Sequence, residues 1–243
     1  MHSMRYVRIL PAGGNAIMVE LGDSIDRLTN LAVHDLAERL LSSGMVGVEE
    51  VIPSYRSLLV LYDPTTTDFD RLSAAIPHLC LDQNEPRYRV RRWQIPVVYG
   101  GFFGPDLTQV AKSKNLSDAE LIELHAAREY HVYMLGFAPG FAYLGELPEQ
   151  LQVSRKASNP VVIPAGSISI GGAQTAISTL AMPSAWSVIG CTPVRAFDPD
   201  RAEPFLFSPG DRVRITAIDS TAYDGFDSDQ WLAKERARQQ EEP

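Results

Sequence analysis

From Tyr130 onward the sequence changes to short β-prone runs separated by glycine and proline, and this pattern most constrains the fold. Many short strands with such punctuation are typical of a closed β-barrel, because closure pairs the edge of every strand. We therefore predict a barrel in this half of the chain. The expected strands are Val132–Leu135, Val161–Ile163, Ser167–Ile170, Thr175–Thr179, Trp186–Gly190 and Arg212–Ala217.

The residues before this region alternate between extended and helical patterns, which predicts an α+β domain. A first helix is capped by Asp23 or Ser24 and stopped by Gly44, and a second begins near Asp68 and is ended by Pro77. The order βαββαβ is typical of a ferredoxin-like arrangement. The expected strands are Tyr6–Leu10, Ala16–Glu20, Val48–Ile52, Ser57–Tyr62 and one near Tyr88–Val90.

A polar segment that ends in proline, Leu81–Pro86, is typical of a linker between domains. We expect a ferredoxin-like domain over residues 1–86 and a barrel domain over residues 87–222. Residues 223–243 predict a polar tail helix.

Composition excludes several classes of function. The formal charge of −8 argues against general binding of nucleic acid or of an anionic membrane, since both need a cationic face. No apolar stretch approaches the roughly 20 residues that cross a bilayer. Cys80 and Cys191 are the only cysteines, and without a recognisable signal peptide they indicate reduced thiols in a cytoplasmic protein. CxxC and HExxH spacings do not occur, so we assign no metal ligand.

In the segment His131–Leu147, a strand-like run is followed over residues 136–143 by two glycines, a proline and three aromatic rings. Glycine lets the backbone approach a ligand, proline fixes φ, and rings supply apolar walls. We expect a rigid pocket rim here; the alternative is a turn whose rings are simply buried. The substrate-binding candidates in this loop are Gly136, Phe137, Pro139 and Phe141.

Polar candidates follow in later turns. Ser167 is either a pocket hydroxyl or a turn residue that bonds its own backbone. The segment Gly171–Thr175 can present N–H groups to an anion. Gln174 within it can form hydrogen bonds with a carbonyl or an amide of a ligand. Arg155 and Lys156 can each clamp a carboxylate or phosphate, or lie as solvated charges.

Four further residues have structural interpretations beside functional ones. Histidine ordinarily titrates near neutrality, so His131 is a candidate for acid–base work as well as a strand residue. His125 ends a helix, where a protonated imidazole is favoured. Asp106 fits an N-cap as well as a ligand, and Asp211 fits a turn before the last strand.

Many segments follow one another as in the KipI/PxpB family, and the chain resembles that family from about Tyr6 to about Ile218. This family also covers allophanate hydrolase subunit 1 and the related half of urea carboxylase. The resemblance implies a cyclophilin-like β-barrel. The segments are Tyr99-Gly100-Gly101, Phe103–Leu107, Gly136–Phe141, Ile163–Ser167, Gly171–Thr175, Trp186–Pro193 and Ser208–Val213.

The resemblance further implies a subunit of an ATP-dependent amide or lactam hydrolase that opens 5-oxoproline to glutamate. ATP, with Mg²⁺, would phosphorylate the lactam oxygen, and a partner would complete the hydrolysis. The implied partners are a second barrel subunit, similar to PxpC or allophanate hydrolase subunit 2, and a hydrolase of the LamB/YcsF type. In this hypothesis the catalytic residues are Arg155 and Gln174, and the substrate-binding residues are Gly136, Phe137, Pro139, Phe141, Ser167 and Thr175.

Departures from the family pattern gather in the expected pocket, at Pro160, Ser178, Ser184, Ala185 and Cys191. They remove cationic and aromatic groups, which indicates a changed ligand or a degenerate site. Two alternatives therefore stay open. One is a KipI-like inhibitor of a sensor histidine kinase, and the other is a carboxyltransferase subunit of the allophanate hydrolase or urea carboxylase type.

Overall fold

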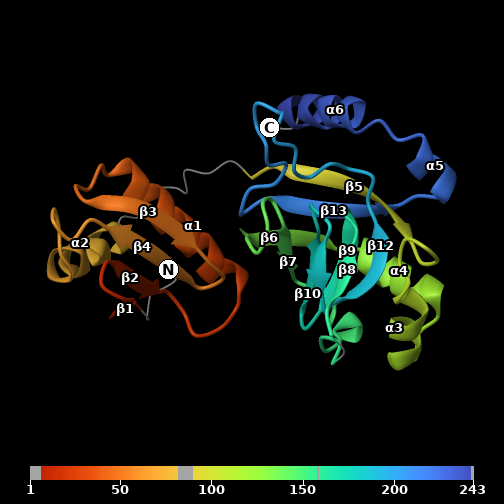
Figure 1. The fold of residues 1–243 in the computed structure, drawn as a ribbon, viewed down its shortest axis with the longest axis horizontal. Helices are drawn as coiled ribbons and strands as arrows, with labels where there is room; N and C mark the ends of the chain where they lie inside the picture. Colours follow the sequence, from red (N-terminus) through yellow and green to blue (C-terminus); the bar gives the residue numbers. More distant parts are fainter. Residues whose placement is uncertain (1–6, 82–89, 158, 242–243) are drawn as a thin grey trace. The chain divides into compact units, whose positions relative to one another are not determined.

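The computed structural model describes residues 7–81, 90–157 and 159–241 (Figure 1). The chain divides into two compact units, Met1–Arg89 and Val90–Pro243. Each unit has its own sheet and its own hydrophobic core. Residues 82–89 lie outside the described residues, and with them most of the expected linker and the expected strand near Tyr88–Val90.

The described residues of the first unit form a four-stranded antiparallel sheet with two helices. Alternate residues of its central strand, Leu58, Val60 and Tyr62, are buried, which is the period of a strand with one face on a core. The elements are β1 (Arg8–Pro11), β2 (Ala16–Glu20), α1 (Arg27–Ser42), β3 (Val48–Pro53), β4 (Ser57–Tyr62) and α2 (Phe69–Leu81).

The strand order of this sheet is β1-β2-β4-β3, so β1 occupies the edge beside β2. The ferredoxin-like label stays a prediction, because its last expected strand lies outside the described residues. Both helices differ at one end from the sequence prediction. Asp26, rather than Asp23 or Ser24, caps α1, because its carboxylate accepts from the N–H of Thr29. Pro77 lies inside α2, which continues because Leu79 and Cys80 pack on the same core.

The second unit contains a closed barrel of seven strands in the order β10-β7-β6-β13-β5-β12-β9, and this confirms the predicted barrel (Figure 1). Strands β5 and β13 pair in parallel, and the other barrel pairs are antiparallel. The strands are β5 (Arg92–Tyr99), β6 (Glu129–Leu135), β7 (Ala142–Gly145), β8 (Val161–Ile163), β9 (Ser167–Gly171), β10 (Gln174–Ile177), β11 (Met182–Ser184), β12 (Ser187–Cys191) and β13 (Arg212–Ala217).

Strands β8 and β11 form a separate two-stranded ribbon outside the barrel. The helices of this unit are α3 (Leu107–Ser113), α4 (Asp118–Ala126), the 3₁₀ turn η1 (Glu149–Leu151), α5 (Ser220–Asp224) and α6 (Ser228–Glu241). Among the described residues, none of the helices is both long and apolar enough to cross a membrane.

Side-chain alternation divides the barrel wall into an inner and an outer face. In β7, Ala142 and Leu144 belong to the barrel core, while Tyr143 between them packs against an outer cluster. In β10, Ile177 belongs to the core and Ala176 to the outer cluster. The interior is filled mainly by apolar side chains, so it leaves the outer face as the place for a ligand.

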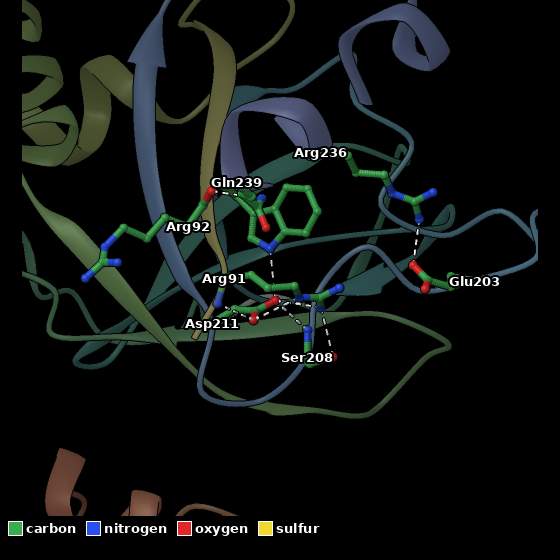
Figure 2. Close-up of polar contacts among 8 residues, drawn as sticks. Arg91, Arg92, Glu203, Ser208, Asp211, Arg236 and Gln239 are labelled. Atoms are coloured by element: carbon green, nitrogen blue, oxygen red, sulfur yellow. Dashed lines mark hydrogen bonds and ion pairs between the residues drawn. The ribbon is translucent and has the colours of Figure 1, made fainter. Parts of the chain in front are cut away.

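A buried carboxylate fixes the start of the barrel. Asp211, whose side chain is 1% exposed, accepts from the indole N–H of Trp93 at 2.9 Å and from Nη2 of Arg91 at 2.8 Å (Figure 2). It also accepts from the backbone N–H of Ser208, which closes the turn before β13. Helix α6 docks on the same place, since Gln239 donates to the carbonyl of Arg92 (Figure 2).

Candidate functional site

A cavity of about 340 Å³ lies on the outer face of the barrel, bordered by the loop between β6 and β7 and by the ribbon strand β11. We call it the aromatic cavity. Its lining is Phe137, Phe141, Tyr143, Arg155, Pro160, Met182, Pro183, Ser184, Ala185 and Trp186.

Four aromatic rings follow one another in edge-to-face contact along this cavity. The ring centroids of Phe137 and Phe141 are 5.9 Å apart, those of Phe141 and Tyr143 4.8 Å, and those of Tyr143 and Trp186 6.0 Å. Phe137 is 71% exposed, whereas Phe141 is buried. The series therefore runs from the surface to the barrel wall and supplies an apolar side for a small ligand.

The backbone of the loop between β6 and β7 is held tightly. Gly136 donates to the carbonyl of Phe141, and the hydroxyl of Thr179 donates to the carbonyl of Pro139 at 2.6 Å. Phe137 has φ of 70°, a left-handed conformation that is costly for a bulky residue. Gly136 and Pro139 thus shape the loop that presents Phe137 and Phe141, without lining the cavity themselves.

Trp186 is placed by a glycine on the neighbouring strand. A Cβ atom on Gly171 would lie 2.7 Å from the indole ring, closer than real Cβ contacts come. The absent side chain lets the ring lie directly on β9. This is a packing reason for a glycine in the Gly171–Thr175 segment, in which the sequence alone suggests an anion site.

Arg155 is the cation of the aromatic cavity. Its guanidinium lies 5.6 Å from the centre of the Trp186 ring, within the range of a cation–π contact. In the described part of the chain, no carboxylate forms an ion pair with Arg155, so its hydrogen-bond donors are available to a ligand. Burial raises the pKa of Tyr143, and the positive charge of Arg155 partly offsets that rise.

The structure brings together Phe137, Phe141 and Arg155 of the predicted site residues, but it places the polar candidates elsewhere. Ser167 is buried and donates to the carbonyl of Pro164 at 2.8 Å, which matches the structural interpretation of this turn. Gln174 is half-buried on the same side of β10 as Ala176 and does not line the cavity.

Thr175 points into the barrel, where it belongs to a buried hydrogen-bond chain. Its hydroxyl lies 3.0 Å from Nε2 of His125 and donates to the carbonyl of Ser169. Because that hydroxyl has one hydrogen, Nε2 of His125 is assigned as the donor to Thr175, and Nδ1 accepts from the hydroxyl of Tyr99 at 2.7 Å.

The expectation of a protonated His125 is wrong. Complete burial lowers the pKa of His125 to about 3, so the ring is neutral at physiological pH. Desolvation outweighs the helix C-terminus here, since the helix end contributes at most about 2 kcal/mol while burial shifts such groups by several pKa units.

The departures from the family pattern fall into two groups. Pro160, Ser184 and Ala185 line the aromatic cavity. Ser178 and Cys191 are buried outside it, where Ser178 donates to the carbonyl of Pro164. Only the first group can alter what the aromatic cavity accepts by direct contact.

A second cavity, of about 540 Å³, lies between α3 and the segment that leads to Arg155. We call it the polar cavity. Asp106 does not cap α3 through its side chain; instead its Oδ2 accepts from Nζ of Lys156 at 2.6 Å and from the N–H of Val188 at 2.7 Å. The lining is Asp106, Gln109, Val110, Ser113, Val153, Ser154, Lys156, Ala157 and Ser187.

Neither cavity matches the donor set that a magnesium nucleotide needs. The aromatic cavity has one cation, Arg155, and the polar cavity has one, Lys156, which is already paired. Among the described residues, no three His, Cys, Asp or Glu side chains gather where they could hold a metal ion. We therefore derive no catalytic step through ATP or Mg²⁺ from these residues.

The chain belongs to a known class of proteins. The chain is a member of the family described as carboxyltransferase domain, subdomain C and D, which matches residues 7–207. It is 40% identical over 214 residues to the B subunit of 5-oxoprolinase from Escherichia coli O157:H7, a match that covers 87% of this chain and 96% of that protein. Within the class, the chain thus belongs to the PxpB family.

Further comparisons support the same family assignment. The chain is 36% identical over 236 residues to the B subunit of 5-oxoprolinase from Bacillus subtilis (strain 168), covering 92% of this chain and 98% of that protein. The crystal structure of TTHA0988 matches with a TM-score of 0.75 and 33% identity, over 88% of this chain and 41% of that longer one. The urea amidolyase of Kluyveromyces lactis matches 96% of this chain and 17% of its own with a TM-score of 0.73; at 16% identity this shows a shared fold alone.

Proposed function

We propose that the chain is a subunit of a 5-oxoprolinase, an assembly that opens 5-oxoproline to glutamate at the expense of ATP, and that the aromatic cavity binds the lactam. The observation that carries this proposal is the guanidinium of Arg155, which stands over an aromatic wall without a carboxylate partner in the described part of the chain. A ligand with a small flat ring and one carboxylate satisfies both features.

Different lining residues contact different parts of 5-oxoproline. Arg155 pairs with the carboxylate of 5-oxoproline, because a planar guanidinium matches a carboxylate with two parallel hydrogen bonds. Phe141, Tyr143 and Trp186 cover the ring and exclude water from it.

The assembly needs further chains. Each of the similar 5-oxoprolinase proteins is one lettered subunit of its enzyme, which implies a complex of several chains. We propose a second barrel subunit and a LamB/YcsF-type hydrolase as partners. The use of ATP and Mg²⁺ is carried by the family resemblance, and we propose that another chain of the assembly supplies the nucleotide site.

Kinetics of the reconstituted assembly test this proposal. The substitution Arg155→Gln is expected to raise KM for 5-oxoproline about tenfold or more, because a charge-assisted pair is lost. Binding of 2-pyrrolidinone, which has the same ring without the carboxylate, should change little and serves as the matched control. An unchanged KM, or activity of the partners without this chain, would refute the proposal.

The surface around the cavity favours a second candidate, a protein-binding role like that of KipI. Phe137 is 71% exposed, and Val162 on the ribbon is 74% exposed. Both side chains offer apolar contact area to a partner protein. The candidate predicts that excess protein inhibits autophosphorylation of a sensor histidine kinase and that Val162→Ser relieves the inhibition; kinases that are unaffected by the wild-type protein would argue against it.

A further inference from the structure

The two cavities share one wall. Arg155 lines the aromatic cavity, and its neighbour Lys156 lines the polar cavity. On the facing segment, Trp186 lines the aromatic cavity and its neighbour Ser187 lines the polar cavity. The two segments are joined by a hydrogen bond from the N–H of Lys156 to the carbonyl of Ala185 at 2.7 Å. A ligand in one cavity therefore rests on the backbone that positions the lining of the other.

The polar cavity contains a fixed ion pair. Oδ2 of Asp106 is held by the N–H of Val188, so the carboxylate cannot turn away when Lys156 moves. The side chains are 15% exposed for Asp106 and 28% exposed for Lys156, which leaves both reachable from the cavity. The ammonium of Lys156 has three hydrogens, and one of them serves Asp106.

An ion pair of this kind is complementary to a zwitterion. The carboxylate of an α-amino acid can bind the remaining donors of Lys156 while its ammonium binds Asp106, so that four charges alternate in sign. A simple anion gains less, because Asp106 repels it. The hydroxyls of Ser154 and Ser187 and the amide of Gln109 remain as donors for a polar side chain of the ligand.

We propose that the polar cavity is a second ligand site, for a free α-amino acid, and that its ligand is glutamate. The choice of glutamate rests on the proposed function, since hydrolysis of the 5-oxoproline amide bond yields that amino acid. Glutamate bound against Lys156 alters the shared wall and weakens lactam binding at Arg155. The site thus gives the product a way to inhibit the subunit without entering the substrate cavity.

Calorimetric titration of the purified chain with L-glutamate tests the proposal. We expect binding that is weakened about tenfold or more in Lys156→Gln and in Asp106→Asn, because each variant removes one of the two charges. Lys112→Gln, on α3 but outside the cavity lining, is the matched control and should bind like the wild type. Thermal unfolding of each variant establishes that it is folded before binding is compared.

Several results would overturn the proposal. No binding of glutamate to the wild-type chain would do so, as would equal binding by wild type and Lys156→Gln. Inorganic phosphate or glutarate, which lack the ammonium, binding as tightly as glutamate would show a plain anion site. Loss of glutamate binding in Arg155→Gln would place the amino acid in the aromatic cavity.

The titrations also separate this site from the proposed function. Binding of 5-oxoproline should be weakened by Arg155→Gln and retained in Lys156→Gln. Glutamate binding that depends on Lys156 in a chain that does not bind 5-oxoproline would refute the lactam assignment and keep the amino-acid site. The reverse result would keep the lactam assignment and refute the amino-acid site.

Discussion

Acidification is expected to destabilise the barrel through His125. This ring is completely buried, and burial lowers its pKa from an ordinary value of 6.5 to about 3. Its two nitrogens are both engaged in the neutral form, with Tyr99 and with Thr175. Below pH 6.5 the unfolded chain takes up a proton at this position and the folded chain does not, so the free energy of unfolding falls as the pH falls.

The size of the effect follows from proton linkage. Between pH 6.5 and about pH 3 the slope is about 1.4 kcal/mol per pH unit for one such group. From pH 7 to pH 5 the loss from His125 is therefore about 2 kcal/mol. That is a large share of the about 5–15 kcal/mol by which a domain is normally stable.

Urea unfolding at several pH values, followed by tryptophan fluorescence, measures this slope. The matched variant is His125→Gln, which keeps an amide for hydrogen bonding and cannot titrate. Other histidines, such as the buried His34 and His131, contribute equally to both proteins. The slope of the wild type should thus exceed that of the variant by about 1.4 kcal/mol per pH unit below pH 6. Equal slopes in the two proteins would refute the burial argument.

Two substitutions test the packing around the site and the barrel start. Gly171→Ala should cost about 1–3 kcal/mol in urea unfolding and weaken 5-oxoproline binding, because the new methyl group meets the ring of Trp186; Gly14→Ala, whose Cβ meets nothing within 4 Å, is the control, and equal costs would contradict the account. Asp211→Ala should cost about 3–5 kcal/mol because it leaves buried donors unpaired, whereas loss of the exposed carboxylate in Asp229→Ala should cost less than about 1 kcal/mol. A similar unfolding midpoint for these two variants would show that Asp211 is not the anchor.

The barrel is predictable from the sequence because each strand has its own local pattern. The local pattern does not show which other strand each strand pairs with. The sequence predicts a strand at Val161–Ile163 and the structure has one, yet it pairs with β11 outside the barrel. The exposure of both Val161 and Val162 agrees with this position, because a barrel strand would bury one of two neighbouring residues. The exposure of a residue depends on the tertiary fold and cannot be read from the local sequence.

The same limit applies to the site. Ser167 and Thr175 are polar residues in glycine-containing segments. The local sequence does not reveal that their hydroxyls donate to backbone carbonyls inside the protein. Tyr143 is one of the three rings of the expected pocket rim but is not among the predicted site residues. It has a detectable signal, because it lies two residues after Phe141 and a strand places both rings on one face. Pocket residues are thus predictable where strand periodicity extends a motif that is already recognised.

The parallel pairing of β5 with β13 has a consequence for biosynthesis. The strand that opens the barrel unit is completed by one that follows more than a hundred positions later, so the register from Arg92 to Ala217 forms only after nearly all of this unit has left the ribosome. Until then β5 exposes an unpaired edge, and the nascent unit is vulnerable to aggregation. Such distant closure also gives the unit a high contact order, from which slow folding follows.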